Sequence, residues 1–124
     1  MNTLDAGCIE CLKNKLLRKR AEKLVYRCGV RADLKGSECL VDAVILYSIG
    51  ASGSFYKLYE LVGAYRSKKP KTVLREISYS ISQATDLALH ITELIGCAVP
   101  DSEIHSSLVI AHLGKALDDH DIAV

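Results

Sequence analysis

The sequence predicts an all-α protein, and its hydrophobic periodicity, composition and lack of strand patterns all favour this class. Apolar residues recur three and four positions apart along most of the chain, which is the spacing of one helix face. Of the 124 residues, 49% are hydrophobic and 25% are charged, an ordinary balance for a folded domain. No alternation of apolar and polar residues persists. We therefore expect one helical domain, residues 1–124, built as a bundle of roughly five or six helices.

The first expected helix has an apolar side and a basic side. Its apolar stripe consists of Leu4, Ile9, Leu12, Leu16, Leu17, Leu24 and Val25. Its polar side carries Lys13, Lys15, Arg18, Lys19, Arg20 and Lys23. Gly29 stands where a glycine commonly ends a helix.

Two breaks delimit the next two helices. Residues 30–36 form a short link, and Ser37 is a suitable N-cap for the helix that follows. Residues 50–54 are small and polar, and Ser52 or Ser54 can cap the third helix. The apolar residues of these two helices are Leu40, Val41, Val44, Ile45 and Tyr47, then Phe55, Leu58, Tyr59, Val62 and Tyr65.

Proline and glycine delimit the C-terminal helices. Pro70 suits the first turn of a helix, and helical spacing then continues to Ile95, so an interruption is expected near Thr85 and Asp86. Gly96 ends this run. Pro100 with the next residue starts the last helix.

The charges of the chain are unevenly distributed. Residues 1–75 contain fifteen Lys or Arg and seven Asp or Glu, whereas residues 76–124 contain one and eight. The net charge of +1 conceals this asymmetry, which offers one basic end to a polyanion. The turn at residues 66–69 and the start of the next helix are basic, with no acidic residue before Glu76.

A helix, a short basic turn and a second amphipathic helix match the helix-turn-helix pattern, here at about residues 54–84. The turn and the first helical turn of such a motif meet DNA, so we predict double-stranded DNA as the partner. The predicted phosphate contacts are Arg66, Lys68, Lys69 and Lys71. The predicted contacts to bases and along the groove are Thr72, Arg75, Ser78 and Tyr79, with Arg75 suited to guanine. A solvated basic turn is the alternative that charge alone leaves open.

Residues 29–36 read Gly-Val-Arg-Ala-Asp-Leu-Lys-Gly and precede an apolar helix. This segment resembles the C-terminal effector domains of the stage-zero sporulation protein A family, where the pattern is Gly-Val-Pro-Ala-His-Ile-Lys-Gly. Further similarity lies in Leu40, Ala43, Ile45, Gly53, Ser54, Lys57, Leu58, Tyr59, Val73, Ile77, Ile81 and residues 107–117. The resemblance spans about residue 24 to the end. It implies a helical fold around a helix-turn-helix, and DNA binding in transcription regulation during sporulation.

The recognition helix departs from that family. Of the family's polar positions that read DNA, only Arg75 keeps its type, whereas Leu74 replaces a Glu, Thr72 and Ser78 replace Arg, and Tyr79 replaces a His. The family's DNA sequence preference is therefore not carried over. The phosphoacceptor receiver domain of these response regulators is also absent from the 124 residues. Loss of DNA readout, with retention of the fold as a protein-interaction module or antagonist, is the alternative function.

Other sites have less support. Cys8 and Cys11 have the spacing of half a zinc site, but on a helix the same spacing belongs to the apolar stripe, so we predict no metal and no cofactor. The sequence contains no recognisable nucleophile with a nearby base and no phosphate loop, so nothing in it argues for an enzyme.

The start of the chain lacks the order of a signal peptide, and no apolar run could cross a bilayer, which favours the cytoplasm. A homodimer on DNA and a regulatory protein partner are further expectations.

Overall fold

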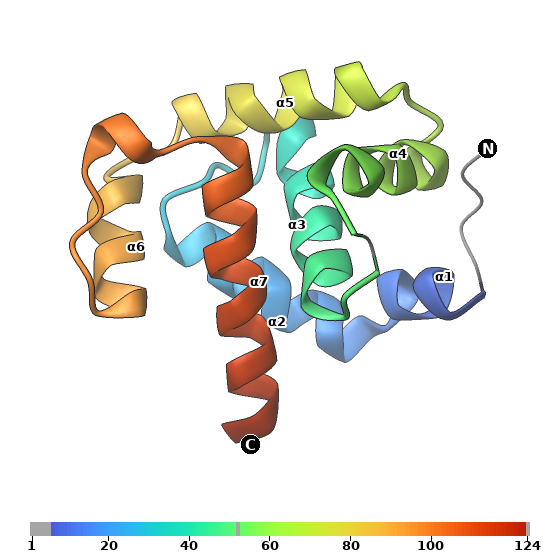
Figure 1. Ribbon diagram of the computed structural model, residues 1–124, viewed down its shortest axis with the longest axis horizontal. Coiled ribbons are helices and arrows are strands. Elements are labelled where there is room, and N and C mark those ends of the chain that lie inside the picture. Colours follow the sequence, from blue (N-terminus) through green and yellow to red (C-terminus); the bar gives the residue numbers. More distant parts are fainter. Residues whose placement is uncertain (1–5, 52, 124) are drawn as a thin grey trace.

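The computed structural model describes residues 6–51 and 53–123, and the side chains of these residues up to Asp118. This part of the chain is helical, without strands, as predicted (Figure 1). Its elements are α1 (Ala6–Lys13), α2 (Lys15–Arg27), α3 (Lys35–Ser48), α4 (Phe55–Arg66), α5 (Pro70–Ser82), α6 (Leu87–Ile95), the 3-10 helix η1 (Asp101–Glu103) and α7 (Ser106–Ala123). Seven α-helices within these residues exceed the predicted five or six, chiefly because the first predicted helix is divided. No helix here combines the length and apolar character needed to span a membrane.

Asn14 divides the first predicted helix into α1 and α2. Its backbone is extended, and its Oδ1 accepts a hydrogen bond from the amide of Leu17 at 2.9 Å. The asparagine side chain thus supplies an N-cap for α2, which a continuous helix would not use. Leu4, the first residue of the predicted stripe, lies outside the described residues, as does Ser52.

Gly29 follows the end of α2, as predicted, and has a second role that periodicity did not reveal. Its φ is +96°, and a β-carbon there would lie 2.1 Å from the carbonyl oxygen of Thr85. The Thr85 amide also donates to the Gly29 carbonyl at 3.1 Å. Glycine therefore lets the end of α2 touch the loop between α5 and α6.

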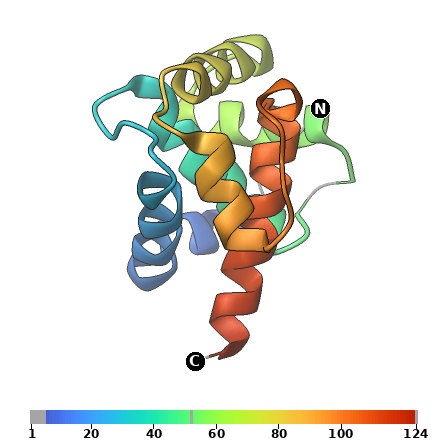
Figure 2. The same cartoon turned by 90° about the vertical axis from the view of Figure 1, so that its left-hand side faces the viewer.

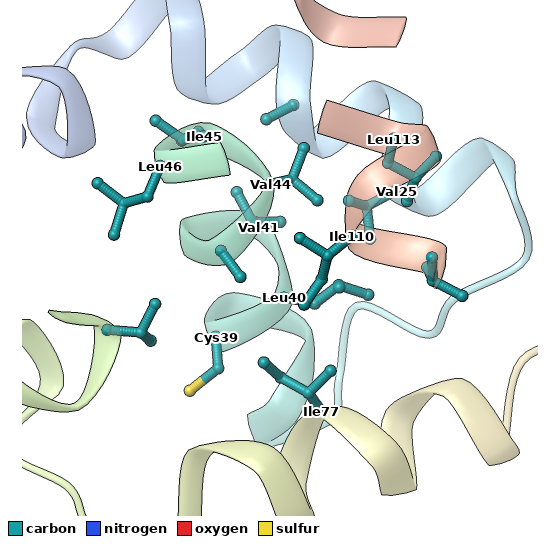
Figure 3. Packing of buried hydrophobic residues seen from close by; sticks show 14 of the residues in the cluster. Val25, Cys39, Leu40, Val41, Val44, Ile45, Leu46, Ile77, Ile110 and Leu113 are labelled. Atoms are coloured by element: carbon teal, nitrogen blue, oxygen red, sulfur yellow. The ribbon is translucent and has the colours of Figure 1, made fainter. Parts of the chain in front are cut away.

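The central element is α3, around which α1, α2, α4, α5 and α7 pack, whereas α6 packs against α7 (Figures 1 and 2). Its buried side chains include Leu40, Val44 and Ile45 (Figure 3). Ile77 of α5 and Ile110 of α7 complete this part of the core. The prediction of Ser37 as N-cap is wrong, because α3 begins at Lys35. The buried Ser37 hydroxyl instead donates to the carbonyl of Leu34 at 2.7 Å.

The interruption predicted near Asp86 is confirmed, since α5 ends at Ser82 and α6 begins at Leu87. Asp86 has a φ of +53° and precedes α6, although its side chain makes no capping hydrogen bond. Gly96 ends α6 as predicted, with a φ of +76°. The prediction for Pro100 needs correction, because it precedes only η1. The extended backbone of Ile104 then separates η1 from α7.

The five cysteines differ in burial, and this predicts their reactivity. Cys8, Cys28 and Cys39 are buried, Cys11 is half-buried and Cys97 is exposed. Burial raises the pKa of the Cys28 and Cys39 thiols to about 11. At pH 8 only about one in a thousand of these two groups is therefore a thiolate, the reactive form.

We expect a disulfide reagent at pH 8 to modify one thiol of the folded chain rapidly. Cys97→Ser should abolish this fast phase, because Cys97 has the most accessible thiol. The denatured chain, in which every thiol is accessible, is the control for total reactivity. A fast phase that persists in Cys97→Ser would contradict the described burial.

Candidate nucleic-acid interface

A tight turn joins α4 to α5. The Ser54 hydroxyl accepts a hydrogen bond from the amide of Lys57, which caps α4 as predicted. At the other end, Ser67 is left-handed, and the amide of Lys68 donates to the carbonyl of Gly63 at 2.8 Å. A β-carbon at Gly63 would lie 2.4 Å from the Lys68 carbonyl oxygen. The turn therefore folds back closely onto α4.

Pro70 occupies the first turn of α5, as predicted, because a missing N–H costs nothing there. One side of α5 faces the core through Val73, Ile77 and Ile81. The opposite side is exposed, apart from a half-buried Thr72. We name it the α5 outer face, and it consists of Lys71, Thr72, Leu74, Arg75, Ser78 and Tyr79.

Arg66 lies on α4 and its guanidinium is directed at α3. Its Nε and Nη2 donate to the two carboxylate oxygens of Asp42 at 2.6 and 3.1 Å, and its Nη1 donates to Glu38 at 3.2 Å. These carboxylates raise the pKa of Arg66. Asp42 is fully buried and also accepts a hydrogen bond from Arg18 of α2. The structure thus places Arg66, a predicted phosphate contact, in a cluster that joins α2, α3 and α4.

Lys68 is also paired within the chain. Its Nζ lies 2.6 Å from Oε1 of Glu76, and this hydrogen bond raises the pKa of the lysine. The pair connects the turn to the second helical turn of α5. Lys68 therefore shares its charge with an acidic neighbour, unlike the other lysines of this segment.

Three cations near the start of α5 remain without an ion pair among the described side chains: Lys69, Lys71 and Arg75. Each is exposed.

Comparisons with protein-family models, curated proteins and solved structures find no match to this chain. The chemistry of the α5 outer face is therefore the basis for a functional proposal.

A basic residue that sequence reasoning missed lies beside this face. Lys35, the exposed first residue of α3, shares a hollow of about 500 Å³ with Arg75 and Tyr79. The link before α3 thus adjoins α5 in space. Lys35 was visible as a basic residue of the link at residues 29–36, but only the packing of α3 against α5 places it beside Arg75.

The other flank of α5 is different in character. A groove of about 650 Å³ runs between α5, the start of α6, η1 and the start of α7, and its lining includes Asp86 and Asp101. The Ser78 hydroxyl lies 2.9 Å from that of Ser106 at the start of α7. Ser78 is thus hydrogen-bonded within the chain, and the carboxylates make this flank unfavourable for a phosphate.

Cys8 and Cys11, the weak metal candidates, both lie on α1. Cys8 packs into the core and Cys11 packs against it. Among the described residues, no group of three or more His, Cys, Asp or Glu is arranged to hold a metal ion.

Proposed function

We propose that the chain binds duplex DNA through α4, the turn and α5, used as a helix-turn-helix, and acts in transcription regulation. The observation that carries this proposal is the group of three exposed cations without an ion-pair partner, Lys69, Lys71 and Arg75, at the start of α5. A helix of 13 residues is about 20 Å long, and the major groove, about 12 Å wide, admits a helix. The resemblance of residues 29–36 to sporulation effector domains supports the same function.

The proposed roles follow from position along α5. Lys69 and Lys71 lie at its N-terminal end, where the helix dipole adds positive potential, and they hold phosphates. Arg75, one turn later, donates to the O6 and N7 of a guanine, and Thr72 lies one turn before it. Tyr79 extends further along the groove, and Lys35 adds a phosphate contact from α3.

Arg66 and Lys68 act differently in this proposal from the other predicted contacts. Their cationic groups already bind Asp42 and Glu76. Breaking either pair would have to precede a strong phosphate contact. We therefore assign them the positioning of α4 and of the turn, and assign the phosphate contacts to Lys69 and Lys71.

The test is duplex binding across a salt series with two charge-matched variants. The α5 variant, Lys71→Gln/Arg75→Gln, removes two predicted contacts, and the control variant, Lys13→Gln/Lys115→Gln, removes two exposed lysines on α1 and α7. We expect the α5 variant to bind at least about tenfold more weakly in low salt. The slope of log affinity against log salt should fall by about 0.9, since Lys71 is the one phosphate contact that this variant loses, whereas Arg75 contacts a base. Fluorescence anisotropy with a labelled random duplex measures both quantities.

The control variant should bind as the unmodified chain does, because its two lysines lie outside the proposed DNA surface. An effect of net charge alone would instead weaken both variants equally. Equal weakening by the two variants would contradict a specific role for α5. Absence of binding even at low salt would contradict DNA binding by this chain.

A protein-interaction role is the second candidate, and two exposed apolar side chains favour it. Leu74 and Tyr79 on the α5 outer face are 39% and 56% exposed. Apolar side chains in the centre of a face suit a protein partner better than a phosphate backbone. This candidate predicts no DNA binding at any salt concentration, and binding to a partner protein that is lost in Leu74→Asp.

A further inference from the structure

Four basic residues form a ridge along α2. Lys15, Lys19, Lys23 and Arg27 recur every fourth residue, one helical turn apart, and all four side chains are exposed. We call them the α2 ridge. Its first and last members are twelve positions apart on the helix, which makes the ridge about 18 Å long.

The α2 ridge faces away from the core. Ala21 and Val25, the buried residues of α2, each lie two positions from Lys23. Two positions on a helix correspond to about 200°, so Lys23 is on the opposite side from both. Arg18 shows the contrast, since its guanidinium is bound by the buried Asp42. No member of the ridge forms an ion pair among the described side chains.

The ridge is also separate from the α5 outer face. Both helices contact α3, which lies between them. In both views α5 runs along one end of the molecule, while α2 lies toward the other end (Figures 1 and 2). A straight duplex that rests along α5 therefore does not also run along the α2 ridge.

The spacing of the ridge suits a phosphate backbone. One strand of B-DNA presents a phosphate about every 3.4 Å along its axis, so about five phosphates lie within 18 Å. Each of the four cations can therefore find a phosphate.

We propose that the α2 ridge is a second phosphate-binding surface, so that one chain bridges two duplex DNA segments, one at α5 and one at α2. This inference rests on the proposed function, since α5 holds the first duplex. The α2 ridge meets phosphates alone and has no groove-reading helix. It is therefore the weaker and more salt-sensitive of the two surfaces.

Bridging is tested by capture of a fluorescent random duplex on beads that carry an unlabelled biotinylated duplex, in the presence of the whole chain. We expect capture with the unmodified chain in low salt. The α2 variant, Lys15→Gln/Lys19→Gln/Lys23→Gln/Arg27→Gln, should capture at least about tenfold less, and the salt slope of capture should fall by about 3.6. Glutamine and lysine have similar helix propensities, and circular dichroism checks that α2 still folds.

The outcomes separate this inference from the proposed function. The α2 variant should keep its binding to a single duplex, which α5 provides, whereas the control variant should both bind and bridge. Single-duplex binding without capture by the unmodified chain would overturn bridging and leave the role of α5 intact. Undiminished capture by the α2 variant would also overturn it, since a dimer with two α5 faces would then be the bridge. Self-association that light scattering detects without DNA, and that the α2 variant loses, would instead assign the ridge to a second copy.

Discussion

Gly36→Ala is expected to destabilise the protein by about 3 kcal/mol, through the contact between α3 and α5. A β-carbon at Gly36 would lie 1.9 Å from the backbone carbonyl oxygen of Glu76 and 2.4 Å from the hydroxyl oxygen of Ser80. A backbone atom has no other rotamer to adopt, so the two helices must separate. Their separation would loosen the packing of Leu40 against Ile77 in the core (Figure 3).

Urea denaturation of Gly36→Ala and Gly53→Ala measures this effect, because both substitutions add the same methyl group. No atom lies within 4 Å of the β-carbon position at Gly53. We expect the free energy of unfolding of Gly53→Ala to stay within about 0.5 kcal/mol of that of the unmodified chain. Equal denaturation midpoints for the two variants would contradict the close approach of α3 and α5. The same displacement should weaken the proposed DNA binding, because α5 packs against α3.

Asp42→Asn is expected to cost about 3 kcal/mol of the free energy of unfolding, at the lower end of the range for a broken buried ion pair. Asp42 is fully buried and accepts hydrogen bonds from both Arg18 and Arg66. An amide removes the negative charge and one of the acceptors. The estimate is at the lower end because the arginine side chains are 22% and 26% exposed and can reach water.

Urea denaturation again measures the change, with Asp33→Asn as the matched control. Asp33 pairs with Arg31 on the surface, where both side chains are more than half exposed. Exposed pairs contribute little, so no measurable change is expected for this control. In a double-mutant cycle, Asp42→Asn combined with Arg66→Gln should cost less than the sum of the single changes. Additive losses would show that Asp42 and Arg66 do not stabilise the fold as a pair.

Sequence reasoning located the α4–α5 segment but did not reveal that two of its cations, Arg66 and Lys68, are paired within the chain. The charge run at residues 66–71 contains Arg66 and Lys68 beside Lys69 and Lys71, and nothing local distinguishes them. A signal was present at Asp42, an acidic residue within an otherwise apolar helix. A buried carboxylate requires a cationic partner, but the sequence does not say which of the many basic residues provides it.

The sequence by itself determined the helical class and several helix ends. Pro70, Asp86 and Gly96 mark such ends because their effect depends on the backbone of a few neighbouring residues. Only the tertiary structure decided which cations remain available for a partner. Arg66 and Asp42 are 24 positions apart, and their pairing depends on how α4 packs against α3. Ser37 and Lys35 show the same limit, since a hydroxyl that could cap a helix is buried, while a lysine of a short link lies beside Arg75. Hydrophobic periodicity records which face of a helix is buried, whereas charge pairing depends on which faces meet.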